Sequence, residues 1–456
     1  MPIGWLVPAD AAAVVLSYGA ALYMRFLGAP PAYNLMAVER TVPVVVVCCL
    51  LLAQIYGLYE RRPMTWPEQV QSIFVLILID GVVATSAAFI DRAFAVPRSV
   101  IALSAVFDLL MMYAYRGIAY RSWTARHGLP DLVLVQPSGT PSDPEPMDGM
   151  SFHVVTCLRL DDASATSRRV LADTVRETRA DGLLLSQDLP GALKEAFALF
   201  AVEAGLELFI VPRLLDLMVL QSRPSMFGDR LVINLTGAAG AGYQRALKRF
   251  IDVCLSALFL VLALPVMGVS ALAVLLDDGP PVLYRQERVG RDGRRFLVTK
   301  IRTMRRDAEA ETGPVKAVPH DPRMTRVGRR LRQLHLDELP QLWNVLRGEM
   351  SLVGPRPERP ELHDEVVAAA PHFAQRLRLL PGLTGLAQVQ GGYDTRPHEK
   401  LKFDMLYSLR ASAALDAQII LRTVRNVLGS LGERPDKAAA ATAATRMTGR
   451  RSEDSR

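Results

Sequence analysis

Long apolar runs near the start of the chain constrain its fold more than any other feature. Each is about as long as a helix that crosses a hydrocarbon core of ~30 Å, the last one only if it begins near Val96. The runs are Ala11–Leu27, Val42–Tyr59, Val70–Ile90 and Val100–Tyr115. With 50% hydrophobic residues and a mean hydropathy of +0.18, the chain is too apolar for an ordinary soluble protein. We therefore expect residues 1–127 to form a bundle of four transmembrane helices.

Basic residues orient the predicted bundle. The N-terminus lacks a basic leader followed by a small-residue cleavage site, so we expect the first helix to be retained as an anchor. Arg61 and Arg62 follow the second run, and Arg116, Arg121 and Arg126 follow the fourth. By the positive-inside rule, both ends of the bundle face the cytoplasm.

Two carboxylates, Asp80 and Asp108, interrupt the third and fourth runs. A charge inside a membrane is costly, and by default it indicates a function or a partner. The alternative is structural, with the two side chains facing each other or Arg25 inside the bundle.

Beyond residue 127, short strand-like segments alternate with helical ones. The strand-like segments are Asp131–Val135, Phe152–Leu158, Asp181–Ser186 and Leu206–Pro212. This alternation predicts a parallel, Rossmann-like sheet in a cytoplasmic domain of residues 128–236. The first strand runs into QPSGTPSDP rather than GxGxxG, so we expect no bound dinucleotide. A docking or regulatory domain and a plain connector are the two interpretations.

The charge pattern favours phosphate or lipid contacts. The net charge is +7, and the arginines concentrate after residue 285 among Gly and Pro rather than aromatic residues. That pattern indicates phosphate or anionic lipid rather than stacked bases, so we expect no nucleic-acid partner. The four cysteines show no CxxC spacing, which indicates neither a disulfide framework nor a zinc site.

A fifth apolar run, Val253–Leu276, follows the small-residue linker Gly237–Gly242. It is long enough to cross a bilayer, but arginines flank both of its ends, and a crossing would separate the domains on either side. Pro265 removes a backbone hydrogen bond and can break the helix. We expect a re-entrant helix, residues 253–276, that enters and leaves by the cytoplasmic face. A fifth span with a tolerated kink is the alternative.

The stretch from His335 to Pro360 begins with an adjacent carboxylate pair, Asp337 and Glu338. A helix is predicted over residues 338–346 because four apolar residues share one face. They are Leu339, Leu342, Trp343 and Leu346.

The ends of that helix locate the pair. Pro340 suits a first turn and Gly348 suits a C-terminal cap, so Asp337 is expected at or near the N-cap. The positive end of the helix dipole would favour its ionised form, which suits a nucleophile or a metal ligand. A plain helix cap is the alternative.

Cations surround the pair in the sequence. The predicted strand Arg295–Ile301 contains Lys300 near its end and is followed by Arg302. The turn SLVGPRPERP carries Arg356. Arginine binds phosphates bidentately, while a carboxylate supplies a nucleophile or a Mg²⁺ ligand. For any single arginine, a solvated basic face on anionic lipid is the alternative.

From Leu247 to Leu428 these motifs resemble the bacterial sugar transferase family, the polyprenyl-phosphate phosphoglycosyl transferases with one re-entrant membrane helix. The matching segments are KRFID, PVLYRQERVGRDGRRFLVTKIRTM, DPRMTRVG, LDELPQLWNVLRGEMSLVGPRPERP, PGLTGLAQVQGGYD and LDAQIILRTV. They assign a catalytic α/β domain to residues 237–431, ahead of a tail, 432–456, predicted to be disordered from its composition. The whole architecture is similar to the long exopolysaccharide-initiating members.

The resemblance implies a two-step transfer. Asp337 attacks the phosphate attached to the sugar of a UDP-sugar, with UDP-glucose or UDP-galactose as the implied donors, and UMP leaves. Undecaprenyl phosphate then takes the phosphosugar from Asp337, which starts an exopolysaccharide repeat unit. One phosphoanhydride replaces another, so catalysis consists mainly of positioning and charge neutralisation.

It also implies roles for other residues. Glu338 would hold Mg²⁺ against the diphosphate. Three basic residues would bind its phosphates: Lys300, Arg302 and Arg356. Three residues of KRFID would set the point where the re-entrant helix enters the membrane, and a proline would break it: Lys248, Arg249, Asp252 and Pro265. The implied location is the bacterial inner membrane, with the catalytic domain in the cytoplasm, membrane lipids as further partners, and homo-oligomerisation left open.

Two segments depart from the family pattern: Ile301 replaces a usual aromatic residue, and Tyr407–Ala413 is less aromatic and basic. Two other functions stay open. One is a catalytically silent membrane scaffold that senses a ligand, although a lipid-binding surface needs no adjacent carboxylates. The other is a Mg²⁺-dependent polyprenyl-diphosphate phosphatase, which would release inorganic phosphate instead of UMP.

Overall fold

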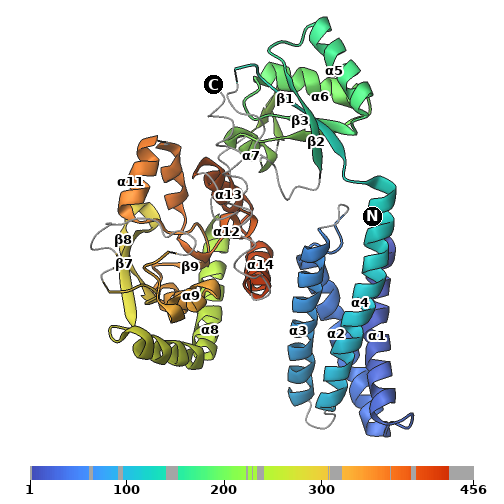
Figure 1. Ribbon diagram of the computed structural model, residues 1–456, viewed down its shortest axis with the longest axis vertical. Coiled ribbons are helices and arrows are strands. Elements are labelled where there is room, and N and C mark those ends of the chain that lie inside the picture. Colours follow the sequence, from blue (N-terminus) through green and yellow to red (C-terminus); the bar gives the residue numbers. More distant parts are fainter. Residues whose placement is uncertain are drawn as a thin grey trace. The chain divides into compact units, whose positions relative to one another are not determined.

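The chain forms two compact units, Met1–Leu217 and Met218–Arg456 (Figure 1). The computed structural model describes residues 3–60, 65–90, 96–139, 152–221, 224–227, 230–233, 241–306, 308, 321–369, 371–391 and 397–430. Arg61, Arg62, most of the linker Gly237–Gly242 and the predicted disordered tail lie outside the described residues.

The described part of the first unit opens with a short 3-10 helix, η1 (Ile3–Trp5), and four long apolar helices. These are α1 (Leu6–Arg25), α2 (Ala32–Ile55), α3 (Trp66–Ile90) and α4 (Arg98–His127). Each is long and apolar enough to span a bilayer, and α1 contacts α2 and α4 while α3 contacts the same two helices. The chain is therefore a multi-pass membrane protein.

A buried ion pair lies within these helices. Arg116 was expected in the connection after the fourth span, but it lies inside α4, is 2% exposed and pairs with Asp10 of α1. Tyr59 donates to the Asp10 carboxylate at 2.5 Å, and Tyr115 also donates to it. Charges in a membrane interior are tolerated when paired in this way. Because its partner is Asp10, Arg116 is weak support for the predicted orientation of the bundle.

The two intramembrane carboxylates, Asp80 and Asp108, are buried between the helices, at 7% and 6% exposure. Arg25 is not their partner, since its Nε donates to Ser99 Oγ at 3.0 Å.

A four-stranded parallel sheet in the order β2-β1-β3-β4 completes the first unit, as predicted from the alternating pattern. Its elements are β1 (Asp131–Gln136), β2 (His153–Arg159), α5 (Ala165–Thr178), β3 (Gly182–Leu185), α6 (Gly191–Glu203), β4 (Glu207–Ile210) and α7 (Leu214–Gln221). Val133 and Val135 of β1 pack with Phe197 of α6 on one face, and Leu132 and Leu134 pack on the other. Burial on both faces explains why β1 reads as a continuous apolar run.

The second unit contains many short elements around one long helix. In chain order they are β5 (Pro224–Phe227), β6 (Arg230–Ile233), α8 (Ala241–Asp278), β7 (Leu283–Val289), η2 (Arg291–Gly293), β8 (Arg295–Ile301), α9 (Arg326–Gln333), η3 (Leu336–Gln341), α10 (Leu342–Arg347), β9 (Ser351–Val353), α11 (Pro360–Ala369), η4 (Pro371–Arg378), β10 (Gly382–Thr384), α12 (Leu386–Gln390), α13 (Pro397–Arg410) and α14 (Ala413–Ser430). β8 is the predicted strand, and β7 is its antiparallel partner. β9 pairs with β10 in parallel.

The long helix α8 is continuous across Pro265, so the proline does not end it as a break would. Its ribbon nevertheless changes direction part-way along (Figure 1). Both ends contact the same unit: Arg249 donates to the Val345 carbonyl at 2.7 Å, and Asp277 accepts from the Val327 amide at 3.0 Å. Those two α8 residues would be ~42 Å apart on a straight helix. Pro265 is the proline inside this helix, and a proline can bend a helix by removing one backbone hydrogen bond.

Candidate active site

The carboxylate pair lies on a 3-10 helix rather than at the cap of an α-helix. η3 covers Leu336–Gln341, His335 precedes it in the left-handed region (φ 53°), and α10 begins only at Leu342. Asp337 is therefore near the N-cap but does not occupy it: the N-cap is His335, because the helix starts at Leu336, two residues before the predicted start at Glu338. Asp337 lies within its first turn and is 4% exposed.

The same change of helix type alters which residues of α10 are buried. Leu342 is 2% exposed, as predicted, but Trp343 is 49% exposed, with the Arg347 guanidinium over its ring at 5.5 Å. A 3-10 turn uses 3.0 residues instead of 3.6, so the apolar face rotates relative to an all-α reading. Val345 takes the buried position, and Gly348 ends the helix at φ 85°, as predicted.

Two cations hold the Glu338 carboxylate. Lys300 Nζ of β8 lies 2.6 Å from Oε1, and Arg356 Nη2, just after β9, lies 2.7 Å from the same oxygen. Arg356 Nη1 is 3.4 Å from Oε2. Burial raises the pKa of Glu338, but the charges of Arg356 and Lys300 outweigh it and hold that pKa well below its ordinary value. Glu338 is therefore anionic at neutral pH.

Asp337 has a different environment. Burial raises its pKa, the adjacent Glu338 charge adds to the rise, and the charges of Lys300, Arg332 and His335 oppose it. The expectation that the helix dipole would favour the ionised form is thus outweighed by desolvation. Asp337 Oδ1 is buried and has no hydrogen-bond partner. This oxygen is available for chemistry once the carboxyl is ionised.

Arg302 points away from the pair. Its Nη2 donates to the carbonyls of Asp278 and Gly279 at 3.0 and 2.6 Å and lies 3.1 Å from the Asp278 carboxylate. The side chain is 6% exposed, and it ties the end of α8 to β8. The structure thus brings Lys300 and Arg356 to Glu338 but not Arg302, whose role with phosphate stays a prediction.

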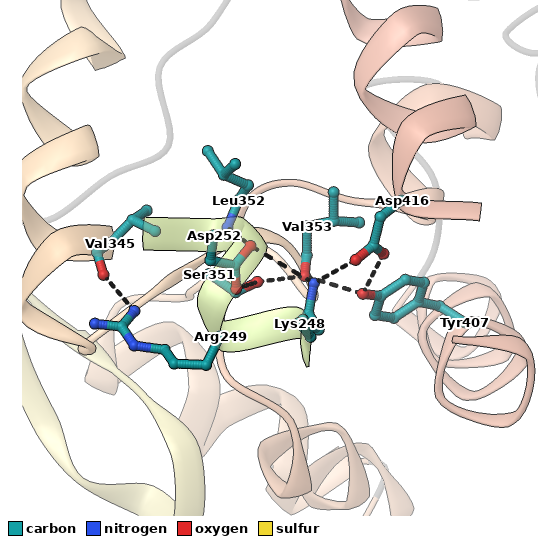
Figure 2. Close-up of polar contacts among 9 residues, drawn as sticks. All are labelled: Lys248, Arg249, Asp252, Val345, Ser351, Leu352, Val353, Tyr407 and Asp416. Carbon is teal, nitrogen blue, oxygen red and sulfur yellow. Dashed lines mark hydrogen bonds and ion pairs between the residues drawn. The ribbon is translucent and has the colours of Figure 1, made fainter. Parts of the chain in front are cut away.

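The basic residues of KRFID fasten α8 to the rest of the unit (Figure 2). Arg249 donates to the carbonyls of Val345 and Leu346 at 2.7 and 2.8 Å, which satisfies the last carbonyls of α10. A Cβ at Gly348 would lie 3.3 Å from the Arg249 guanidinium, so glycine suits this approach as well as its positive φ. Lys248 Nζ lies 2.7 Å from Asp416 of α14.

Asp252, the last residue of KRFID, binds the strand beside the site. It accepts from Ser351 Oγ at 2.7 Å and from the Leu352 amide at 3.2 Å, both on β9. Tyr407 completes the cluster by donating to Asp416 at 2.7 Å (Figure 2). These contacts place α8 against α10, β9 and α14; where the helix meets the membrane stays a prediction.

Sequence reasoning did not single out two arginines. Arg332 of α9 acts electrostatically on Asp337, and Arg288 of β7 donates to the Pro357 carbonyl at 3.1 Å. Burial and the nearby like charges of Arg356 and Arg359 lower the pKa of Arg288 to about 10. The only signal in the sequence was the high density of arginine, which does not indicate which ones meet.

The residues available for Mg²⁺ are few. Among the described residues, no group of three or more His, Cys, Asp and Glu side chains could hold a metal ion. Mg²⁺ is often held by one or two carboxylates together with substrate phosphates and waters. The free oxygen of Asp337 and the adjacent Glu338 fit that incomplete kind of site, although Glu338 already contacts two cations. Substrate phosphates would have to complete it.

The part of this chain that matches known proteins contains the whole candidate site. Residues 243–430 match the family model described as "Bacterial sugar transferase". A UDP-glucose:undecaprenyl-phosphate glucose-1-phosphate transferase of Caulobacter vibrioides is 44% identical over 188 residues, which are 40% of this chain and 69% of that protein. The chain belongs to the bacterial sugar transferase family.

Other known proteins match the chain to different extents. A UDP-N-acetylgalactosamine-undecaprenyl-phosphate N-acetylgalactosaminephosphotransferase of Aeromonas hydrophila is 38% identical over 193 residues, 41% of this chain and 45% of that protein. A Bacillus subtilis protein named for transfer of N-acetylgalactosaminyl 1-phosphate is 45% identical over 132 residues, 29% of this chain and 73% of that protein. The chain thus spans under half of the Aeromonas relative.

Proposed function

We propose that this chain transfers a sugar 1-phosphate from a UDP-sugar to undecaprenyl phosphate and so starts an exopolysaccharide repeat unit. The observation that carries the proposal is the unpartnered, buried oxygen of Asp337 beside a carboxylate that two cations neutralise. The names of the Caulobacter and Aeromonas relatives support the reaction class. Those names differ in the sugar, glucose in one and N-acetylgalactosamine in the other. UDP-glucose and UDP-galactose, the donors implied by the family resemblance, are the proposed donors to test first, and UDP-N-acetylgalactosamine belongs in the same panel.

The proposed first step is a displacement at phosphorus. An ionised oxygen of Asp337 forms a bond to the phosphorus that bears the sugar, and the bond from that phosphorus to the bridging oxygen breaks. UMP leaves with the electron pair of that bond. The product on the chain is an aspartyl phosphosugar.

In the second step, an oxygen of undecaprenyl phosphate attacks the same phosphorus. The bond to Asp337 breaks, the carboxylate is restored, and polyprenyl-diphosphate-sugar leaves. Both steps exchange one high-energy phosphorus bond for another, so the residues around Asp337 mainly position and neutralise.

Arg356 is the cation best placed to follow the substrate. Its side chain is 44% exposed, whereas those of Lys300 and Glu338 are 17% and 12% exposed. It can therefore exchange part of its contact with Glu338 for a substrate phosphate, while Lys300 keeps Glu338 in place. When bound by Glu338 and substrate phosphates, Mg²⁺ would supply further positive charge against the diphosphate.

The test is UMP release from a panel of UDP-sugars with Mg²⁺ and undecaprenyl phosphate. We expect lipid-dependent, sugar-selective UMP release by the native chain and none by Asp337→Asn. Asp364→Asn, an exposed carboxylate change on α11, is the matched control and should retain the native rate. Without the lipid, acid-quenched native protein should carry radiolabel from the UDP-sugar, and the Asp337 variant should not.

Two results would count against the proposal. Absence of UMP for every donor, from protein that is folded and membrane-inserted, would exclude the transferase for those donors. Release of inorganic phosphate from a polyprenyl diphosphate would instead favour the phosphatase.

A further inference from the structure

An apolar groove lies between α3 and α4 on the exposed side of the first unit's helices. Its volume is about 470 Å³. Phe74 and Leu78 of α3, which line it, are 50% and 49% exposed, and Ala102 and Ala105 of α4 leave room between them. At Gly81 an added Cβ would meet no atom within 4 Å, so the groove is open there.

The groove has the length of one membrane leaflet. Along α4 its lining extends from Arg98 to Leu109, which corresponds to ~16 Å at 1.5 Å per residue. A bilayer hydrocarbon core is ~30 Å thick, so the groove reaches from one surface to about the midplane. One acyl chain of a phospholipid would fill that depth, whereas an undecaprenyl chain is much longer than the groove.

The surface end of the groove is cationic. Arg98, the first residue of α4, lines the groove, is exposed, and has no side-chain hydrogen bond or ion pair within the described part of the chain. Arg25 of α1 donates to Ser99 Oγ at 3.0 Å, which brings a second guanidinium to the same end. The N-terminus of α4 carries no side-chain cap. The Val100 amide already donates to the Pro97 carbonyl at 2.8 Å, so the amides of Arg98 and Ser99 are the ones open to an acceptor.

We propose that this groove is a binding site for an anionic phospholipid. One acyl chain lies between α3 and α4, and the phosphate group is held by Arg98, Arg25 and the first amides of α4. Any lipid could fill the apolar part, but two guanidinium groups at its end favour a headgroup with net negative charge. The inference concerns the membrane helices and does not depend on the proposed transferase reaction.

The experiment is native mass spectrometry of the purified full chain, titrated with dioleoyl phosphatidylglycerol or dioleoyl phosphatidylcholine. The native chain should retain phosphatidylglycerol preferentially. Arg98→Gln should weaken phosphatidylglycerol retention about five-fold, the factor that follows from ~1 kcal/mol per basic residue at an anionic surface. Gly81→Leu should remove retention of both lipids at this site, because the side chain occupies the groove.

Two substitutions of the same kind serve as controls. Arg121→Gln changes an exposed arginine at the other end of α4, and Gly19→Leu changes an α1 glycine that also has open space around it. Both should leave retention unchanged. Glycine is a poor helix former, so neither leucine variant is expected to unfold its helix.

Equal retention of the two lipids by the native chain would overturn the proposal. Equal phosphatidylglycerol retention by Arg98→Gln and Arg121→Gln would also overturn it, as would equal lipid retention by Gly81→Leu and Gly19→Leu. Displacement of phosphatidylglycerol by equimolar undecaprenyl phosphate would also overturn it, by showing that the groove takes the polyprenyl lipid instead.

Discussion

Asp337 and Glu338 are adjacent in the sequence, yet only Glu338 contacts cations directly, through Lys300 and Arg356. Burial acts on both carboxyls, but the two cations lower the pKa of Glu338, while the pKa of Asp337 is raised. Neighbouring carboxylates with opposite shifts are typical of sites where one group reacts and the other stays charged. The pair therefore suits the roles that we propose for it.

The rate of the proposed reaction should depend on the protonation of Asp337. Only its ionised form can attack phosphorus, and its raised pKa means that the rate falls, as pH decreases, at a higher pH than for an exposed aspartate of pKa ~4. Arg332→Gln removes a cation that favours the ionised form, so the acid limb should move to higher pH while the plateau rate changes less.

The check is a pH profile of UMP release for the native chain, Arg332→Gln and a control variant, Arg330→Gln. Arg330→Gln, an exposed arginine of α9, is the control and should keep the native profile. If the Arg332 and Arg330 variants have the same acid limb, the electrostatic role of Arg332 is wrong.

Glu338→Gln should destabilise the second unit at neutral pH, because it leaves Lys300 and Arg356 facing each other without a carboxylate. We expect a loss of about 2 kcal/mol, less than for a fully buried pair because Arg356 is half-exposed. The pKa of Glu338 is depressed, so its stabilisation is complete above the unfolded pKa of ~4.3 and fades as pH falls below it.

Thermal unfolding of the native chain and Glu338→Gln, at pH 7 and at lower pH, measures this loss of stability and its pH dependence. The melting temperature should drop by roughly 4–8 °C at pH 7, and the difference should shrink under acid conditions. Glu361→Gln, an exposed change on α11, should have no effect. A deficit that stays constant with pH would contradict the ionic explanation.

Among the single elements, α8 is the one through which we predict that the second unit meets the membrane. It is apolar enough to be a fifth span, yet contacts at both of its ends hold it to one unit. A helix fixed in this way cannot place its ends on opposite sides of a membrane while the unit stays on one side. The contacts favour the predicted re-entrant helix over a fifth crossing.

Cysteine labelling from the periplasmic side tests this topology. Single cysteines at Leu247 and Leu276, in a chain whose native cysteines are replaced, should both resist a membrane-impermeant reagent. Leu27→Cys, in the 94% exposed position between α1 and α2, should react if the bundle has the predicted orientation. Labelling at Leu276 but not at Leu247 would establish a fifth span.

At the scale of the whole molecule, the candidate site lies entirely within the second unit. The Bacillus subtilis relative, 73% of which is matched by 132 residues, has little sequence beyond the matched part. The carboxylate pair and its two cations all lie in the second unit, so we predict that the membrane helices and the parallel sheet of the first unit are not required to form the site.

Truncation before about Gly240 should leave a membrane-bound fragment that still releases UMP. The rate should stay within a few-fold of that of the full chain, because α8 and all its contacts remain. The assay compares both proteins at equal amounts in the same membranes. A fragment that is inserted and folded but inactive would show that the first unit is needed for activity.

Many elements of the fold follow from local patterns in the sequence. Apolar runs of bilayer length predicted the membrane helices, alternating segments predicted the parallel sheet, and β8 has the predicted bounds. The order of motifs also located the carboxylate pair inside the region that matches the family. Each of these signals is a short segment or the order of such segments along the chain, so no knowledge of the fold is needed to detect them.

Which charges meet depends on how the chain folds in three dimensions. Lys300 and Glu338 are 38 residues apart, and Asp10 and Arg116 are 106 apart, so neither pair leaves a local pattern. The same applies to Arg302, which contacts the end of α8 instead of the site. Partners of this kind are chosen by packing and desolvation, since a buried charge must find a counter-charge wherever the folded chain brings one.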